Sequence, residues 1–432
     1  MNCKYRLCYI DVIGTLKNLN LLFLVVVIYS FKIDRLAFLS TRGSIIIACI
    51  IFYLLLLNKN NVVINKIHLL WIVSVIVMIL SSLISRFQQE SLKYTMLFLI
   101  GVLYFIYFSN NKELLLNVMK IQKYFSVIFA VFTLLPLLDV TLYYRILELL
   151  FDSKSVSEIK SLMIVFNRYV GIGRFAGNNG FILSLGLGIA LCEMLTQRKV
   201  IHVVYIIIFF ISIFLTGSRY AFLASILSMV LVVFFFYHKK THLSRLTKFI
   251  LLIVLIFICI LLSYCFFPSS IFDRFMNMES IYNRFKLYNL AWELFLQRPI
   301  LGHGINTFLY YTFYRIDMLE KTYTHNVFLQ LLSETGIIGT ILIIASFIVT
   351  LLSGIVSIKN LKYSEDKHLL ITFRFTLYLQ FMFLIYFLTG NPIYDYNQLY
   401  LYFIFSSYAI CSFDRKQARL KNVKYLNFKQ KN

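Results

Sequence analysis

The chain has 432 residues, of which 60% are hydrophobic and only 14% are charged, and its mean hydropathy is +0.79. These values exclude an ordinary soluble globular protein and predict an integral membrane protein. The formal net charge is +23. We expect this charge to serve membrane topology and contacts with anionic membrane lipids, and we expect no nucleic-acid partner.

Apolar segments recur along the whole chain and predict its architecture. They cover about residues 16–32, 43–57, 67–85, 93–108, 121–138, 175–195, 200–216, 220–237, 248–267, 336–357, 369–389 and 395–412. Each is near the roughly 20 residues that a helix needs to cross a bilayer core. Because a backbone in lipid must satisfy its own hydrogen bonds, the sequence predicts an all-α, polytopic protein of about 12 transmembrane helices. Residues 1–432 are expected to form a single membrane-embedded domain.

The basic residues divide between the two sides of this predicted bundle. Most lysines lie in the amino-terminal segment, in alternate connections and in the basic tail of residues 413–432, so this side and both termini are expected to be cytoplasmic. Arginines, among them Arg174, Arg219, Arg284 and Arg298, lie on the opposite side. A guanidinium binds a phosphate through two hydrogen bonds and keeps its charge, so these arginines indicate an anionic ligand. The alternative for each is a solvated loop residue.

Two connections on the arginine-rich side are long, residues 139–174 and 268–325, and both are expected to be periplasmic. Within the second, residues spaced by three and four predict an amphipathic helix whose apolar side carries Ile281, Phe285, Tyr288, Trp292 and Phe295. We expect this helix to lie along the outer membrane interface and to direct Arg284 toward a cavity. The alternative is a packing helix with a solvated arginine.

The stretch "THNVFLQLLSETGIIG" follows that loop and predicts a helix that begins near Thr324. Asn326, Gln330 and Glu334 would share one face, which should contact protein or water because a buried charge costs about 3 kcal/mol or more at depth. His325 would stand at the outer tip, either as a functional group or as a simple helix cap. We expect Glu334 to contact Arg219 or Arg284.

A second helix start, in "LTGSRYAFLAS", places Arg219 at the outer boundary of another predicted span. Helix N-termini attract anions, so a guanidinium there fits a diphosphate clamp. The alternative is an arginine that only extends its charged end to the membrane surface.

Four motifs carry a resemblance to a known family. In chain order they are "GRFAGNNGF" (Gly173–Phe181), "TGSRYAFLA" (Thr216–Ala224), "NRFKLYNLAWELFLQRPILGHGINTF" (Asn283–Phe308) and "HNVFLQLLSETGIIG" (His325–Gly339). Together, over about residues 173–339, they resemble the O-antigen ligase and polymerase superfamily of bacterial envelope enzymes. The last motif also fits the His-Asn and Gly-x-x-Gly spacing that is typical of the ligases.

The resemblance implies a membrane-embedded type C glycosyltransferase at the outer face of the bacterial inner membrane. Its donor would be an oligosaccharide on undecaprenyl diphosphate, and a chain-length regulator is a further candidate partner. Carried over by motif, Arg219 and Arg284 would bind the diphosphate and His325 would activate the acceptor hydroxyl. Arg174 is a weaker match, because the asparagines that follow it are displaced from the family pattern.

Other residues of the same region complete the expected site. Asn326, Gln330, Glu334 and Arg298 are candidates for substrate binding. The outer loops contain no Asp-x-Asp pair that would hold a metal-bound nucleotide sugar, so we expect a reaction without a metal or another cofactor.

The sequence leaves the acceptor open. We favour a polymerase of an O-antigen or capsule, which adds to another lipid-linked repeat unit; a ligase that adds to lipid A core is the alternative. A flippase or other transporter would also be basic and polytopic, but its cations should line a path across the membrane. A structural scaffold would tolerate His325→Ala and Arg284→Ala.

Overall fold

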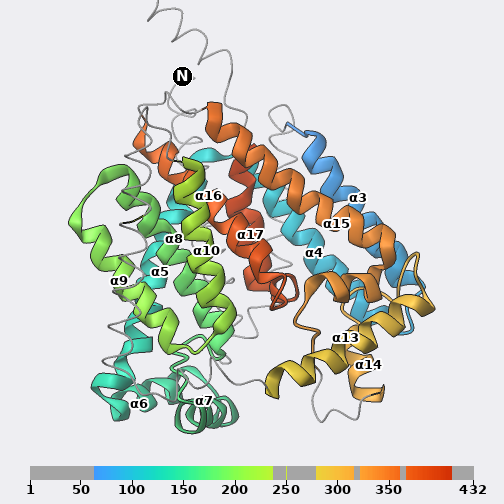
Figure 1. The fold of residues 1–432 in the computed structure, drawn as a ribbon, viewed down its shortest axis with the longest axis horizontal. Helices are drawn as coiled ribbons and strands as arrows, with labels where there is room; N and C mark the ends of the chain where they lie inside the picture. The colour runs from blue at the N-terminus through green and yellow to red at the C-terminus, as the bar shows by residue number, and fades with distance from the viewer. Residues whose placement is uncertain (1–62, 237–249, 251–278, 316–321, 361–365, 411–432) are drawn as a thin grey trace, which may run out of the picture.

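The computed structural model describes residues 63–236, 250, 279–315, 322–360 and 366–410, and within them every regular element is a helix (Figure 1). The elements are α3 (Lys66–Leu83), α4 (Gln88–Ser109), α5 (Lys112–Leu138), α6 (Val140–Leu150), α7 (Ser153–Phe166), α8 (Ala176–Gln197), α9 (Val200–Leu215), α10 (Arg219–Phe236), α13 (Glu279–Gln297), α14 (Phe308–Arg315), α15 (Val327–Asn360), α16 (Lys367–Tyr386), η3 (Pro392–Tyr394), α17 (Tyr396–Ser406) and η4 (Ser407–Ile410). The predicted all-α class is confirmed.

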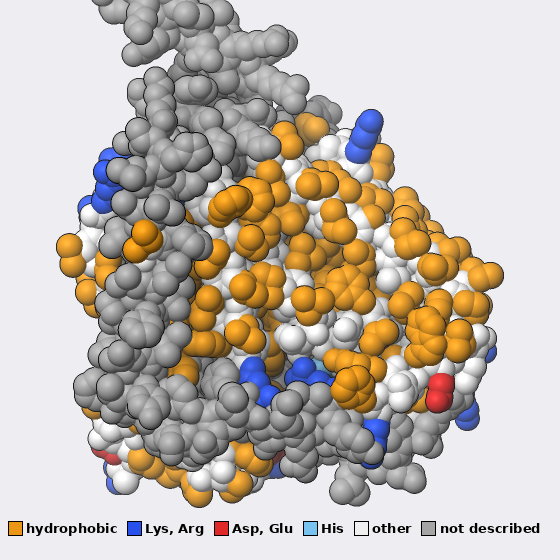
Figure 2. Space-filling view, viewed as in Figure 1, with side chains coloured by type: hydrophobic (Ala, Val, Ile, Leu, Met, Phe, Trp, Pro, Cys, Tyr) orange, Lys and Arg blue, Asp and Glu red, His pale blue; other side chains and the backbone are white. Residues whose placement is uncertain are grey.

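Six of the described helices, α3, α4, α5, α8, α15 and α16, are long and apolar enough to cross a membrane, and α9 and α10 are shorter apolar helices. On the face shown in Figure 2, the described part of the bundle is largely hydrophobic. Both observations confirm a polytopic membrane protein. The predicted number of twelve spans is not confirmed, since the spans at 16–32 and 43–57, nearly all of 248–267 and the tail 413–432 lie outside the described residues.

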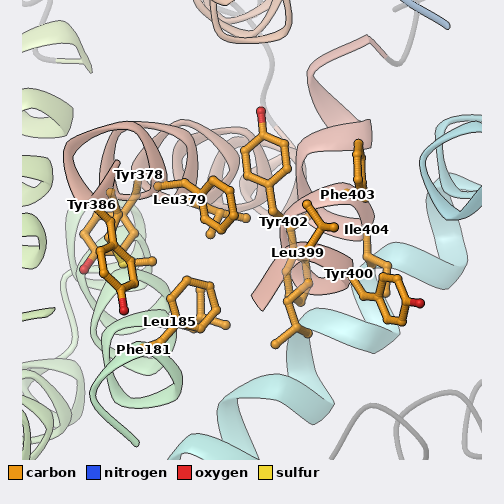
Figure 3. Packing of buried hydrophobic residues seen from close by; sticks show 14 of the residues in the cluster. Phe181, Leu185, Tyr378, Leu379, Tyr386, Leu399, Tyr400, Tyr402, Phe403 and Ile404 are labelled. Carbon is orange, nitrogen blue, oxygen red and sulfur yellow. The ribbon is translucent and has the colours of Figure 1, made fainter. Parts of the chain in front are cut away.

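The centre of the bundle is filled by aromatic side chains of α16 and α17 (Figure 3). The ring of Tyr402 lies 4.5 Å from that of Phe383 and 4.8 Å from that of Phe347 on α15. Glycines allow neighbouring helices to approach these rings: a Cβ atom on Gly188 would lie 2.2 Å from Tyr378. Small residues at helix contacts are how membrane helices gain close packing without a hydrophobic driving force.

Both predicted long connections contain helices, and these lie across one end of the bundle (Figure 1). Residues 139–174 contain α6 and α7, whose first turns are capped by Asp139 and Asp152. The side chains of these aspartates accept hydrogen bonds from backbone N–H groups that would otherwise have no partner in the first turn. In the second connection, α13 and α14 cover the same end of the bundle near the start of α15.

The amphipathic helix predicted in the second connection is α13, but the side that it buries differs from the prediction. Leu287, Leu290 and Leu294 are buried and pack against α14, whereas Phe285 is 58% exposed and Trp292 is 49% exposed. The helix carries two apolar stripes, and spacing alone does not say which one meets a neighbour. Because α15 and α14 lie against the aliphatic stripe, the aromatic stripe remains at the surface, as tryptophan commonly does at a membrane interface.

Candidate active site

His325 lies in a tight turn immediately before α15. Its backbone has a left-handed φ of 58°, and the next residue but one, Val327, donates a backbone hydrogen bond to the carbonyl of Phe387 at 2.9 Å. Asn326 caps the helix, because its Oδ1 accepts from the backbone N–H of Leu329 at 3.2 Å. The N-terminal capping hydrogen bond of α15 thus comes from Asn326, and the role of His325 stays a prediction.

Gln330 holds this turn from within the protein. It is fully buried, and its Oε1 accepts from the backbone nitrogen of Thr324 at 3.3 Å and from the Thr324 hydroxyl at 3.2 Å. Its Nε2 donates to Glu334 at 3.1 Å. The expectation that this polar face meets protein or water is confirmed. Gln330 thus supports the turn that carries His325, and its predicted contact with substrate stays a prediction.

Glu334 lies one turn further into the helix, and its expected contact with Arg219 or Arg284 is wrong. One carboxylate oxygen accepts from the backbone N–H of Phe308 at 3.0 Å and from Gln330; the other accepts from the backbone N–H of Asn306 at 2.7 Å and from the Tyr394 hydroxyl at 2.6 Å. Glu334 thus fixes the start of α14 and is itself buried. A carboxylate within reach of four donors keeps its hydrogen bonds inside the protein.

The third and fourth sequence motifs interlock at a break in α15. Gly336 has a left-handed φ of 63° inside this helix, and the break leaves backbone groups that residues of the α13–α14 connection satisfy. Gly304 N–H donates to the Glu334 carbonyl at 2.7 Å, and Ile337 N–H donates to the Pro299 carbonyl at 2.8 Å. A Cβ atom on Gly302 would lie 2.4 Å from the Glu334 backbone. Gly302 and Gly336 are therefore explained by this crossing.

Three of the predicted site residues come together from separate elements. Arg219 is the first residue of α10, Arg284 is in the second turn of α13, and His325 precedes α15. The positive charge of Arg284 acts on both Arg219 and His325, so the three groups lie within electrostatic range of one another. Lys and Arg side chains gather where the hydrophobic surface meets the end covered by α13 and α14 (Figure 2).

The charge state of His325 follows from this environment. Burial, and then the neighbouring charge of Arg284, lower its pKa from 6.5 to about 4. Both causes disfavour the protonated ring. The imidazole is therefore neutral at pH 7, with a nitrogen able to accept a proton or a hydrogen bond.

Arg174 and Arg298, which were also predicted as site residues, make contacts with other parts of the protein. Arg174 forms an ion pair with Glu158 of α7 at 3.5 Å, and its guanidinium lies 5.2 Å from the centre of the Phe175 ring. Arg298 is exposed and donates to the backbone carbonyl of Ile84 at 2.9 Å. It follows Arg284 by 14 residues, which is about 20 Å along a helix. Arg298 thus joins the end of α13 to the end of α3.

Asn391 is a site residue that the sequence motifs do not include. Its side-chain amide lies 3.1 Å from the backbone nitrogen of His325 and 3.1 Å from Oε1 of Gln330. It precedes Pro392, and an Asn-Pro pair is a recognised turn signal. That signal indicates a turn after a predicted span, but nothing in it indicates contact with a histidine more than sixty residues earlier.

Residues 204–344 match the family model for O-antigen ligase. No curated protein sequence matches the chain. The matched segment includes the second, third and fourth motifs and ends before Asn391, while the first motif, with Arg174, precedes it. The match confirms the resemblance to the O-antigen ligase and polymerase superfamily, and the side chains of Arg219, Arg284 and His325 all belong to the matched segment.

Proposed function

We propose that this protein is a glycosyltransferase that moves a glycan from undecaprenyl diphosphate to a hydroxyl group of another lipid-linked repeat unit. The observation that carries the proposal is the convergence of Arg219, Arg284 and a neutral His325 at one end of the bundle, within the segment that matches the O-antigen ligase family. Two fixed cations beside a proton acceptor suit the displacement of an anionic leaving group.

The proposed reaction needs one bond to form as another breaks. The acceptor oxygen attacks the anomeric carbon, and the bond from that carbon to the diphosphate oxygen breaks, so a single displacement inverts the anomeric centre. Arg219 and Arg284 stabilise the negative charge that develops on the diphosphate. His325 accepts a hydrogen bond from the acceptor hydroxyl and takes its proton as the new bond forms.

The cellular setting is part of the same proposal. The lysine-rich ends and alternate connections favour a cytoplasmic location of both termini. The end of the bundle that carries α13 and α14 then faces the periplasm, where a lipid-linked glycan would be extended. A transporter would instead need cations along a path through the bundle. Arg374, inside α16, donates to Thr196 at 2.7 Å, at the end of α8 away from that face.

The test is a reaction with purified components. The wild-type protein, incubated with lipid-linked repeat units, should produce a ladder of longer products, and His325→Ala should produce none. His368→Ala is the matched control, because His368 is exposed at the start of α16, at the opposite end from Phe387. Equal activity of His325→Ala and His368→Ala would reject the assignment.

The acceptor is tested in cells. Deletion of a polymerase leaves a single repeat unit on each acceptor core, whereas deletion of a ligase leaves core without any repeat unit. We expect the first pattern when the envelope polysaccharide is separated by electrophoresis. Bare core in the deletion strain would assign the ligase reaction instead.

A further inference from the structure

A group of tyrosines and carboxylates lies beside the His325 turn and has no part in the proposed displacement. Tyr310 comes from α14, Tyr323 from the segment before α15, Tyr396 from the start of α17, Glu90 from the start of α4 and Asp395 from the residue before α17. All five are half-buried, so each keeps part of its side chain at the surface. We refer to them as the tyrosine cluster.

Mutual interactions place these side chains together. Tyr310 shares a hydrogen bond with the Glu90 carboxylate. Tyr396 interacts electrostatically with Glu90, Asp395 and Tyr310. Tyr323 interacts in the same way with Tyr396, Asp395 and Tyr310. Side chains from α4, α14, the segment before α15 and the start of α17 therefore meet at one place.

Neighbouring aromatic rings pack against the tyrosine cluster. The ring of the fully buried Tyr94 lies 5.6 Å from that of Tyr396 and 5.5 Å from that of Tyr394, and the Tyr394 ring lies 5.2 Å from that of Tyr323. Tyr310 stacks on Phe87 with ring centres 4.7 Å apart. The half-buried rings are thus held by aromatic contacts, whose geometry is specific.

The cluster is joined to the proposed catalytic turn. Tyr323 precedes His325 by two residues, and its hydroxyl donates to the Asn306 side chain at 3.3 Å. Tyr323 lies within the field of Asp395, whereas His325 lies within that of Arg284. The surroundings therefore change from acidic to basic between Tyr323 and His325, which only Thr324 separates. A diphosphate would be repelled by the acidic side and attracted by the basic side.

The chemistry of the acidic side fits an uncharged, hydroxyl-rich ligand. The C–H face of a sugar ring packs on an aromatic ring, and its hydroxyl groups donate to carboxylates and exchange hydrogen bonds with phenols. Burial, and then neighbouring acidic groups, raise the pKa of Tyr310 and of Tyr323, so both phenols remain protonated donors at pH 7. Rigid rings with a few polar groups are typical of ligand sites.

We propose that Tyr310, Tyr323 and Tyr396, with Glu90 and Asp395, bind the sugar that receives the transferred glycan. The inference rests on the proposed function, because it assigns the donor and the acceptor of that reaction to two adjoining binding sites. The arginines hold the diphosphate of the donor, and the tyrosine cluster holds the acceptor sugar so that its hydroxyl reaches His325.

The test measures sugar binding apart from turnover. The probe is the glycan released by mild acid from the lipid-linked intermediates of the cell that carries this chain, and its binding to purified protein in nanodiscs is followed by saturation-transfer NMR. Tyr310→Ala and Tyr396→Ala should each weaken binding about tenfold, the loss expected when one ring contact is removed. Tyr310→Phe, which keeps the ring, should lose less. Tyr144→Ala, in half-buried surroundings on α6, is the matched control and should bind as the wild type does.

A second measurement separates this inference from the proposed function. In the reaction with lipid-linked repeat units, the alanine variants should consume donor with an unchanged KM but release more free glycan and form less polymer, because water replaces the missing acceptor. A wild type that binds the glycan yet transfers nothing would reject the proposed function and leave the sugar site standing. Unchanged glycan binding in Tyr310→Ala and Tyr396→Ala, or no binding to the wild type, would overturn the sugar site.

Discussion

At the scale of the residue, His325 is a neutral group whose environment disfavours its charge. Burial and the charge of Arg284 lower its pKa to about 4, so the free protein carries an imidazole that is a weak base. A diphosphate beside Arg284 would cancel that repulsion and add negative charge near the ring. Donor binding should therefore strengthen His325 as a base at the moment when a proton must be removed.

The pH dependence of the reaction tests this reading of His325. Because only the neutral ring accepts a proton, activity should fall on the acid side of the pKa. The profile of kcat/KM, which reports the free protein, should fall with an apparent pKa near 4, and the profile of kcat should fall at a higher pH. Initial rates at low and saturating donor from about one pH unit below this pKa up to pH 8 give both curves. An acid limb of kcat/KM near 6.5 would contradict the effect of burial.

Glu334 provides a second test at this scale. In Glu334→Gln, the new amide nitrogen must face a backbone N–H of Asn306 or Phe308, or the Tyr394 hydroxyl, where the carboxylate accepted hydrogen bonds. An unmatched buried polar group costs about 1–3 kcal/mol, so the variant should melt at a lower temperature and form less product. Glu148→Gln, at an exposed ion pair on α6, should change neither. An unaltered melting temperature of Glu334→Gln would refute its supporting role.

At the scale of the element, the sequence pattern of α15 predicts the helix but not the break within it. Hydropathy predicts the span, and the polar face through Gln330 is confirmed. The break at Gly336 was not predicted, because a glycine in an apolar run is equally typical of close helix packing. The structure shows instead a backbone crossing with Ile300 and Gly302. Such a crossing depends on two segments at once, and neither segment shows it alone.

Substitution of two glycines in α15 distinguishes a crossing from ordinary packing. In Gly336→Ala, the left-handed φ is strained and the Cβ atom would lie 2.3 Å from the Ile300 carbonyl oxygen, so we expect a loss of about 1–3 kcal/mol in stability together with loss of transfer activity. Gly354→Ala is the control, since its Cβ atom would lie 2.8 Å from Cδ2 at the movable end of the Leu377 side chain and 3.3 Å from its next neighbours. Thermal melting of both variants in one detergent gives the comparison. Equal melting temperatures would argue against the crossing.

The sequence of α13 also leaves one feature undetermined, namely which side of the helix is buried. Spacings of three and four identify an amphipathic helix, and the helix is present. They do not identify its buried side, because aliphatic and aromatic residues each form a stripe. The buried side is determined by the positions of α15 and α14, which lie against Leu287 and Leu294, and these positions are tertiary properties.

At the scale of the whole molecule, the arrangement in the membrane follows from the distribution of polar and apolar surface. The exposed Trp292 on α13 and the hydrophobic surface of the bundle (Figure 2) predict that α13 lies at the interface between lipid and water. The fully buried Trp71 lies inside the bundle. The chain contains two tryptophans, which makes each of them a separate probe.

Fluorescence quenching by brominated lipids tests this position. In a Trp71→Phe variant, Trp292 should be quenched most strongly by bromine atoms close to the headgroups, as expected for an interfacial tryptophan. In the converse Trp292→Phe variant, the buried Trp71 should be quenched only weakly at any depth. Strongest quenching of Trp292 by bromine at the ends of the acyl chains would place α13 inside the bilayer and contradict the interfacial position.

Sequence motifs predicted some residues of the candidate site and not others. Arg219, Arg284 and His325 were predicted from their motifs, and the structure brings them together, while their catalytic roles stay predictions. Asn391 and Tyr394 were not predicted, since their contacts with the His325 turn and Glu334 join segments separated by a complete helix. Sequence spacing carries no information about such pairs.

The contacts of Val327 with Phe387 and of His325 with Asn391 have a consequence for synthesis of the protein. A ribosome-bound chain that stops after α15 already contains all four motifs, yet the peptide groups that would hold its histidine have not been made. Catalytic competence should therefore appear only after translation has passed Asn391. A gene fragment that encodes only residues 204–344 would still match the family model. We expect its product to be inactive, because it lacks Phe387 and Asn391.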